Sequence, residues 1–446
     1  MPFLSREATV APPGFNRWLV PPAAIAVHMC IGQIYGFSVF KKPLARVLGI
    51  DAPGPGDWAE ADVGVAFSIA LALLGLSAAV FGKWVERAGP RKTMVASAAC
   101  FCGGLVLASL AVRWHQLWLL YVGYGLVGGV GLGLGYIAPV STLMKWFPDR
   151  PGMATGMAIM GFGGGALIGG PLAEELMGRF ASAGSVGAAE ALLAMAGLYA
   201  VSMLFGAWLV RLPPEGWKPQ GWEPKPTKPG AAALAPYASV ALETAWRTPQ
   251  FWLLWVVLCM NVSAGIGILG QASPMIQDMF GVDAAAGAGY VGLLSICNLG
   301  GRFLWSSFSD LVGRRATYCV YFILGAALYL CVPWTQQRGD VTLFVVVTGL
   351  ILSMYGGGFA TIPAYLRDLF GSRNVGAIHG RLITAWSLAA LIGPQLVDRL
   401  SEANKRTLPP EQAYNGIFLL MVGLLAVGLV ANLLVRPVDP KHHVDS

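Results

Sequence analysis

Arg302 is a permanently charged residue inside an apolar stretch that continues to a charged turn beginning at Asp310. Asp310 follows Arg302 by eight residues, which is about 12 Å along a helix. If that helix crosses a bilayer, the guanidinium lies near the midplane, where an arginine costs at least ~2.5–3.5 kcal/mol and usually marks a path for a substrate or an ion. A guanidinium binds a carboxylate through two parallel hydrogen bonds and keeps its charge. Arg302 therefore predicts a carboxylate-binding site; the alternatives are a buried ion pair and a side chain that reaches the membrane surface.

The composition indicates that lipid surrounds most of the chain. Of 446 residues, 56% are hydrophobic and 12% are charged, whereas about 25% of residues in soluble domains are charged. Mean hydropathy is +0.62, and the 58 glycines suit helices that pack closely in lipid. The net charge of +7 comes from basic residues in short clusters between apolar runs, which argues against a nucleic-acid partner. The seven cysteines show no metal-ligand spacing, and we expect no cofactor, no metal site and no enzymatic activity.

Apolar runs of about 20 residues, the length that crosses a bilayer, recur twelve times along the chain. Lipid offers no partner to unpaired backbone groups, so each run is expected to be a helix. Glycine and proline interrupt the fifth and the eleventh run. The runs lie near residues 18–40, 63–82, 93–112, 116–144, 152–176, 188–211, 250–273, 286–309, 316–335, 341–366, 375–398 and 414–436. The sequence therefore predicts an all-α membrane protein with 12 transmembrane helices.

The basic residues between the runs predict the orientation of the chain. Nineteen of the 30 lysines and arginines fall on the side of the termini and nine on the opposite side, which places both termini in the cytoplasm by the positive-inside rule. We expect a multi-pass protein of the cell (inner) membrane. The longest polar connection, 212–246, is rich in proline and is predicted to be a cytoplasmic linker. It separates an N-terminal six-helix bundle, 1–211, from a C-terminal six-helix bundle, 247–446.

The two halves of the chain repeat each other at one constant offset in residue number. The segment Glu86 to Arg91 matches the segment Asp310 to Arg315, and Pro139 matches Pro363 at the same offset. A third match at that offset joins Ala166-Leu-Ile-Gly169 to Ala390-Leu-Ile-Gly393. Three matches at one offset predict two pseudo-symmetric six-helix bundles, the parallel repeat of one large class of transporters.

A glycine- and charge-rich motif follows the second run, in Gly82-Lys-Trp-Val-Glu-Arg-Ala-Gly-Pro-Arg91. It resembles the loop signature of the major facilitator superfamily, with glutamate in place of aspartate. The residues that carry the resemblance are Gly82, Glu86, Arg87, Gly89 and Arg91. A weaker copy after the eighth run has Asp310, Gly313 and Arg314. An acid at a helix end beside a basic turn suits a conformational gate that holds two bundles in one state, and the alternative is a topology signal only.

Within that superfamily the chain resembles the oxalate:formate antiporter family along nearly its whole length. Four strings carry the resemblance: Tyr35-Gly-Phe-Ser-Val-Phe-Lys-Lys-Pro43, Trp146-Phe-Pro-Asp-Arg150, Arg247-Thr-Pro-Gln-Phe-Trp252 and Asn298-Leu-Gly-Gly-Arg302. The resemblance implies a secondary active transporter of small organic anions with the major facilitator fold, in which Arg302 holds a carboxylate. Its partners are then a small carboxylate substrate and the lipid bilayer, and we expect a monomer.

Two departures from the related families refine the substrate. Asn298 stands where the proton-coupled monocarboxylate transporters have an aspartate, and Trp386 stands where oxalate-carrying members have a second cation, a lysine. One cation matches one carboxylate, which favours a monocarboxylate of the formate, lactate or pyruvate type. The alternatives are an oxalate or dicarboxylate carrier, a carrier of a non-carboxylate solute, and a non-transporting membrane sensor. The lack of a deep acid favours exchange or uniport over proton symport driven by a carboxylate.

Aromatic side chains are candidates for the wall of the substrate site. Tyr35, Tyr355 and Phe359 match aromatic positions of the family, and the last two lie one helical turn apart; packing is the alternative role. His28 lies inside the first run and is a candidate proton carrier, or else a hydrogen-bonded core residue. Lys41 and Lys42 end the first run and either attract anions or form a solvated rim.

Overall fold

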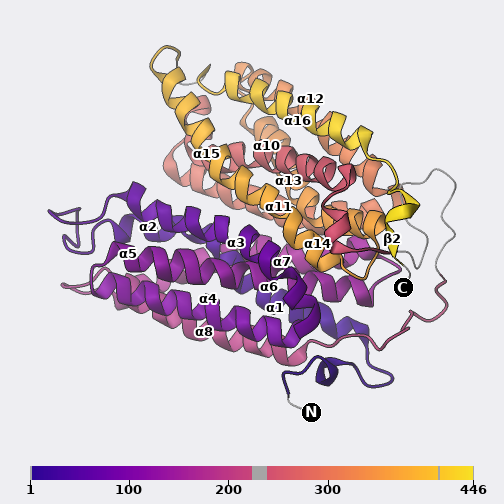
Figure 1. The fold of residues 1–446 in the computed structure, drawn as a ribbon. Helices are drawn as coiled ribbons and strands as arrows, with labels where there is room; N and C mark the ends of the chain where they lie inside the picture. The colour runs from indigo at the N-terminus through magenta and orange to yellow at the C-terminus, as the bar shows by residue number, and fades with distance from the viewer. Residues whose placement is uncertain (1–2, 224–238, 410–411, 445–446) are drawn as a thin grey trace. The chain divides into compact units, whose positions relative to one another are not determined.

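The computed structural model of the chain describes residues 3–223, 239–409 and 412–444, and these are mostly helical (Figure 1). The helices of the first half are α1 (Val20–Gly32), α2 (Ser38–Leu44), α3 (Glu60–Ala88), α4 (Pro90–Arg113), α5 (Leu117–Leu120), α6 (Gly128–Trp146), α7 (Pro151–Phe180) and α8 (Ala188–Leu209). A 3-10 turn, Gln33–Gly36, joins α1 to α2, and a π-helical segment, Tyr121–Val127, joins α5 to α6.

The second half has a similar series of long helices. They are α9 (Leu242–Ala245), α10 (Pro249–Phe280), α11 (Ala284–Val312), α12 (Arg314–Gln337), α13 (Val341–Phe370), α14 (Val375–Leu382), α15 (Thr384–Lys405) and α16 (Asn415–Leu434). Short strands β1 (Ser239–Val240) and β2 (His443–Val444) pair antiparallel. The helices of the predicted seventh, eighth and tenth runs each begin at an N-cap residue. The side chains of Thr248, Asp283 and Asp340 accept a hydrogen bond from the backbone N–H three residues later.

Eleven helices of the described chain are long and apolar enough to cross a membrane. The helix α11, with 29 residues, is also long enough, and it carries the polar residues Asn298 and Arg302. The prediction of an all-α protein built from long apolar helices is confirmed. The interrupted runs behave differently: α7 continues through its glycines for 30 residues, whereas the eleventh run breaks at Ile383 into α14 and α15.

The chain forms two compact units. The first contains residues 1–148, 157–222 and 376–387, and the second contains 149–156, 223–375 and 388–446. Two short stretches therefore pack with the unit formed by the other half of the chain. The division predicted from the sequence, at 1–211, 212–246 and 247–446, stays a prediction, and residues 224–238 of that linker lie outside the described residues.

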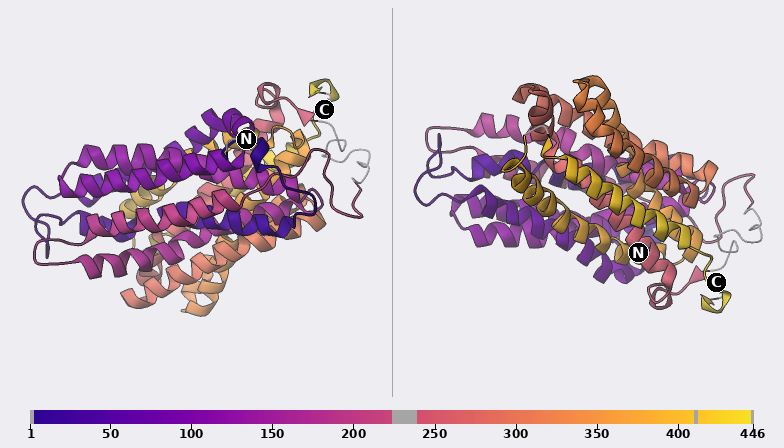
Figure 2. Two further views of the ribbon diagram at one scale, coloured as in Figure 1. Left: turned by 90° about the horizontal axis from the view of Figure 1, so that it is seen from below. Right: turned by 90° about the horizontal axis from the view of Figure 1, so that it is seen from above.

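Inside each unit, close helix pairs bury the core. In the first unit α4 packs against α8 and α3 against α6, and in the second unit α11 packs against α13 while α16 lies along α10 and α12 (Figures 1 and 2). Glycine permits α11 and α13 to approach closely: a Cβ added at Gly301 would lie 2.1 Å from the backbone oxygen of Ser353. The pair α11 and α13 carries most of the predicted substrate residues.

Candidate substrate and gating sites

Arg302 is buried in the second unit, with 1% of its surface exposed. Its Nε donates a hydrogen bond of 3.2 Å to Oδ1 of Asn298, one turn earlier on α11. Its Cζ lies 5.3 Å from the ring centroid of Phe359 on α13, within the range of a cation–π contact. Asn298 and Phe359 therefore orient the guanidinium from two sides.

Glycine on α13 makes room for these side chains. A Cβ added at Gly356 would lie 2.5 Å from Oδ1 of Asn298 and 3.1 Å from Cγ of Arg302. Tyr355 and Phe359 lie on the same helix, both buried, with their ring centroids 5.2 Å apart and their planes nearly perpendicular at 88°. Four of the predicted substrate residues, Arg302, Asn298, Tyr355 and Phe359, thus come together in the second unit.

The other two predicted substrate residues, Tyr35 and Trp386, come together in the first unit. Their ring centroids lie 6.3 Å apart, and both contact Phe162 on α7, at 5.2 Å from Tyr35 and 5.6 Å from Trp386. The ring of Tyr136 on α6 lies 5.7 Å from that of Trp386. Tyr136 and Phe162 complete an aromatic cluster and were not predicted, because each comes from a helix whose apolar pattern gives no sign of which ring faces a site.

Two buried histidines adjoin the aromatic cluster. The ring of His28 stacks on that of Tyr136, with 5.4 Å between centroids and 21° between planes, and the ring of His379 lies 5.9 Å from Tyr136. Both imidazoles are at most 1% exposed. His28 was predicted as a candidate, and His379 was missed although it is an ionisable residue inside the eleventh apolar run, which is a signal the sequence contains.

The first copy of the loop motif, Gly82–Arg91, brings α3 close to α14. A Cβ added at Gly82 would lie 2.8 Å from Cα of Ala377. Oε2 of Glu86 accepts a hydrogen bond of 2.7 Å from Nζ of Lys145 on α6, and a Cβ added at Gly376 would lie 2.5 Å from Oε1 of Glu86. Glu86 therefore lies against the first turn of α14, where a negative charge is favoured by the helix dipole.

Gly89 and Arg91 form the other end of this copy. Gly89 has φ +81° and ψ 166°, a backbone conformation open to glycine almost alone. Arg91 is 2% exposed, and its guanidinium donates to backbone oxygens of the N-terminal segment and of the end of α8. The acceptors are Phe3 at 3.0 Å, Ala207 at 3.2 Å, Ala8 at 3.4 Å and Val210 at 3.5 Å. Arg87 is exposed.

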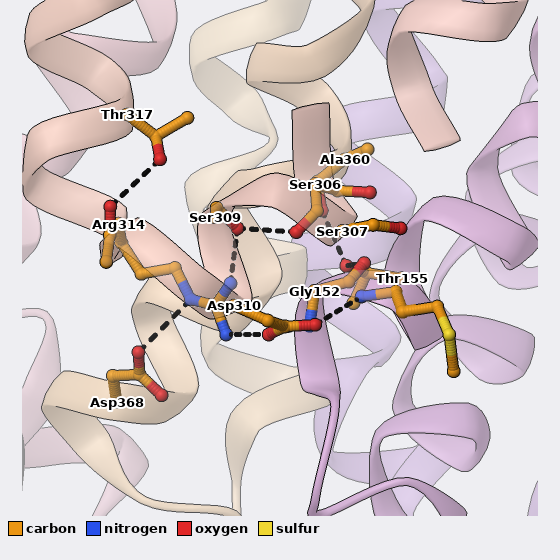
Figure 3. Close-up of polar contacts among 12 residues, drawn as sticks. Gly152, Thr155, Ser306, Ser307, Ser309, Asp310, Arg314, Thr317, Ala360 and Asp368 are labelled. Carbon is orange, nitrogen blue, oxygen red and sulfur yellow. Dashed lines mark hydrogen bonds and ion pairs between the residues drawn. The ribbon is translucent and has the colours of Figure 1, made fainter. Parts of the chain in front are cut away.

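The second copy, Ser306–Arg315, holds the first turn of α7 (Figure 3). Asp310 accepts hydrogen bonds from the backbone N–H of Gly152 at 2.9 Å and of Met153 at 2.8 Å. Arg314, 7% exposed, forms ion pairs with Asp310 at 2.5 Å and with Asp368 at 3.2 Å. Gly313 has φ +97°. This network satisfies two backbone donors that a helix start otherwise leaves unpaired.

Comparison with known proteins identifies the family. Residues 15–394 and 291–446 match the family described as Major Facilitator Superfamily. The chain belongs to the major facilitator superfamily. It is therefore a multi-pass membrane transporter in a lipid bilayer, as predicted. The pseudo-repeat and the loop motif had indicated this superfamily from the sequence.

Individual relatives of this major facilitator protein are distant but match most of its length. The uncharacterized MFS-type transporter YhjX of Escherichia coli (strain K12) is 26% identical over 381 residues, which is 84% of this chain and 86% of the relative. The oxalate:formate antiporter of Oxalobacter formigenes is 25% identical over 382 residues, 85% of this chain and 83% of the relative. A solved structure of the proton:xylose symporter XylE, 12% identical, aligns with a TM-score of 0.67 over 94% of this chain and 96% of its own.

The two copies of the major facilitator loop motif hold equivalent helix starts. The offset that separates Glu86 from Asp310 also separates Gly152 from Gly376. Glu86 lies beside Gly376, and Asp310 accepts a hydrogen bond from Gly152, so each acid meets a glycine from the opposite half of the sequence. The sequence analysis found the acids but missed the glycines, which the same offset would have revealed. It also missed Lys145 and Asp368, whose roles depend on contacts between helices.

Proposed function

We propose that the protein is a secondary active transporter of small monocarboxylates, of the formate, lactate or pyruvate type, that works by alternating access. The observation that supports this most strongly is Arg302, a cation 1% exposed on a helix of a membrane bundle. Such a residue is expensive to keep in a membrane protein and is usually functional. Its role as the carboxylate-binding group is the centre of the proposal.

The surroundings of Arg302 suit a planar anion. Its Nε donates to Asn298, and the ring of Phe359 lies 5.3 Å from its Cζ, so the orientation of the guanidinium is restricted. A restricted guanidinium loses less conformational entropy when it binds a carboxylate through parallel hydrogen bonds. Asn298 is neutral, so it orients Arg302 without cancelling the positive charge that attracts an anion.

The aromatic residues support a small and singly charged substrate. Tyr355 and Phe359 in the second unit, and Tyr35 and Trp386 in the first, present rings rather than charges. A second carboxylate would need a second cation, and at Trp386 the chain has an indole. The oxalate:formate antiporter that this chain resembles names formate among its substrates, which agrees with this choice.

We further propose that both copies of the loop motif are conformational gates. Glu86 lies against the first turn of α14 and Asp310 against the first turn of α7. Release of these acids from the helix starts would be part of the change between states. The excess of basic residues on the side of the termini supports cytoplasmic termini in the cell (inner) membrane.

Counterflow in proteoliposomes tests the role of Arg302. Liposomes loaded with unlabelled pyruvate should take up labelled pyruvate, and formate and lactate should compete. Arg302→Ala should reduce counterflow at least tenfold, because it removes charge-assisted hydrogen bonds worth about 1.5–3 kcal/mol each. Arg302→Lys should restore little, because an ammonium lacks the planar fork.

Arg338→Ala is the matched control, since Arg338 is exposed at the end of α12 and its Cζ lies 3.9 Å from the ring centroid of Trp334. It should exchange pyruvate like the wild type. Wild-type counterflow by Arg302→Ala would contradict the proposal. Competition by oxalate stronger than that by formate, lactate and pyruvate would favour the dicarboxylate alternative, and competition by neutral solutes alone would favour a non-carboxylate carrier.

A further inference from the structure

The imidazole of His28 lies between two hydrogen-bond acceptors. His28 is 0% exposed; its Nδ1 lies 2.5 Å from the backbone oxygen of Ala158 on α7, and its Nε2 lies 3.1 Å from that of Tyr136 on α6. Carbonyl oxygens only accept hydrogen bonds, and a neutral imidazole has a single N–H. Neutral His28 therefore donates to one carbonyl and directs the lone pair of its other nitrogen at the second. Protonated His28 donates to both.

We propose that His28 is the proton-binding site of this transporter and that one proton bound there accompanies each monocarboxylate. This inference rests on the carboxylate transport proposed above and adds the coupling ion. The step is the addition of one proton to a neutral imidazole to form imidazolium, with no other bond made or broken. The proton carries +1 and the substrate −1, so the transported pair is neutral.

The packing around His28 includes a contact that stabilises a cation. The ring of Tyr136 stacks on the imidazole with 21° between planes, and a cation over an aromatic face is stabilised by the ring. A Cβ added at Gly161 would lie 3.1 Å from Cβ of His28, so glycine lets the backbone of α7 approach closely enough for Ala158 to accept a hydrogen bond. The ring of Phe162 adds an edge-on contact at 6.4 Å.

Among the described residues, the groups near His28 that can titrate are mainly tyrosines, a cysteine and a second histidine. Tyr136 faces it from α6, and His379 from α14 interacts with it electrostatically; α8, which packs on α1, carries Tyr199, and α1 itself carries Cys30. The stretch of α7 packed here, from 157 to 173, contains no charged residue. Imidazoles titrate between about pH 5 and 8, whereas tyrosine and cysteine do so at higher pH.

His379 is the less suitable of the two histidines. Both of its ring nitrogens are without a hydrogen-bond partner among the described residues, so a proton bound there would have no acceptor for either N–H. A charged and unsatisfied group in an apolar interior is strongly disfavoured. A charge on His379 would also repel one on His28. The proton is therefore assigned to His28, with His379 as a neutral neighbour.

The test separates proton coupling from exchange. Proteoliposomes containing a pH-sensitive dye receive labelled pyruvate under an inward proton gradient, and counterflow is measured without a gradient. The wild type should accumulate pyruvate and acidify the lumen as it does so. His28→Gln should lose accumulation and acidification but keep counterflow, because exchange needs no net proton movement. His379→Gln should keep all three, and so should His442→Gln, a control in the C-terminal 3-10 helix Pro440–His442.

Several outcomes would overturn the inference. One is gradient-driven accumulation by His28→Gln at the wild-type level. Another is loss of counterflow in both His28→Gln and His28→Asn, since the imidazole would then be needed for something other than the proton. A wild type that exchanges pyruvate in counterflow but neither accumulates it nor acidifies the lumen under the inward proton gradient would overturn proton coupling and leave monocarboxylate transport standing. A wild type that moves no carboxylate at all would instead remove the proposed function.

Discussion

The two copies of the loop motif have the same spacing but are anchored at opposite ends. In the first copy the basic end is buried: Arg91 donates to four backbone oxygens, whereas Glu86 has an ion pair with Lys145. In the second copy the acidic end carries the network, because Asp310 binds two backbone N–H groups and Arg314. The copies therefore share a backbone and differ in which side chain anchors it.

One substitution between the copies explains much of this difference. Arg314 occupies the position at which the first copy has Pro90, so the first copy has no cation at the position that pairs with the acid in the second copy. Lys145, from α6, takes that place for Glu86. The two copies thus share the glycine turn but differ in their ion-pair partners, and the two proposed gates should differ in strength.

The acids should show the largest difference. Asp310→Asn removes the charge that pairs with the nearly buried Arg314 and weakens two backbone hydrogen bonds, which should cost about 2–3 kcal/mol. Glu86→Gln removes one ion pair whose side chains are 14% and 24% exposed, and should cost about 1 kcal/mol. Thermal unfolding in detergent, followed with a thiol-reactive dye at buried cysteines such as Cys30 and Cys259, measures both. Equal losses would show that the second network adds no stability.

The basic ends should show the reverse order, with a smaller effect. Arg91→Ala leaves buried carbonyls of α8 and of the N-terminal segment without their donor, at a cost of about 1–3 kcal/mol. Arg315, its equivalent, is exposed and donates to the backbone oxygen of Leu433 near the end of α16, so Arg315→Ala should cost less than about 1 kcal/mol. The same unfolding assay compares them. A larger loss for Arg315→Ala would contradict the anchoring described for the first copy.

Sequence patterns predicted the fold because membrane helices are defined by length and hydrophobicity. The apolar runs, the internal repeat and the loop motif were each visible in the sequence, and the family match confirms the superfamily that they indicated. The prediction that glycine and proline interrupt the fifth and eleventh runs holds for the eleventh run, which breaks into α14 and α15, but not for the fifth. The helix α7 continues past its glycines and past Pro171. In a membrane bundle glycines often permit packing rather than end a helix, and neighbouring groups can satisfy the backbone group that a proline leaves unpaired.

The candidate sites were predictable only in part, because contacts between distant helices leave no local pattern. Arg302 and Asn298 are one turn apart on one helix, so their proximity followed from spacing. Phe162 meets Trp386 from a helix far away in the sequence, and neither position reveals the other. The acceptors of His28 are backbone oxygens, which the identity of a residue does not disclose.

The glycine turns offer the smallest and most direct test of what the copies share. Gly89 and Gly313 have φ +81° and +97° with ψ 166° and 150°, a region that costs other residues about 1–3 kcal/mol. A Cβ at Gly313 meets nothing within 4 Å, whereas one at Gly89 would lie 3.1 Å from Cγ of Arg6. Gly313→Ala should therefore report backbone strain alone, and Gly89→Ala should cost slightly more in the unfolding assay. If Gly313→Ala is as stable as the wild type, the turn geometry is not under strain, and the two copies are held by their side chains rather than by a shared backbone.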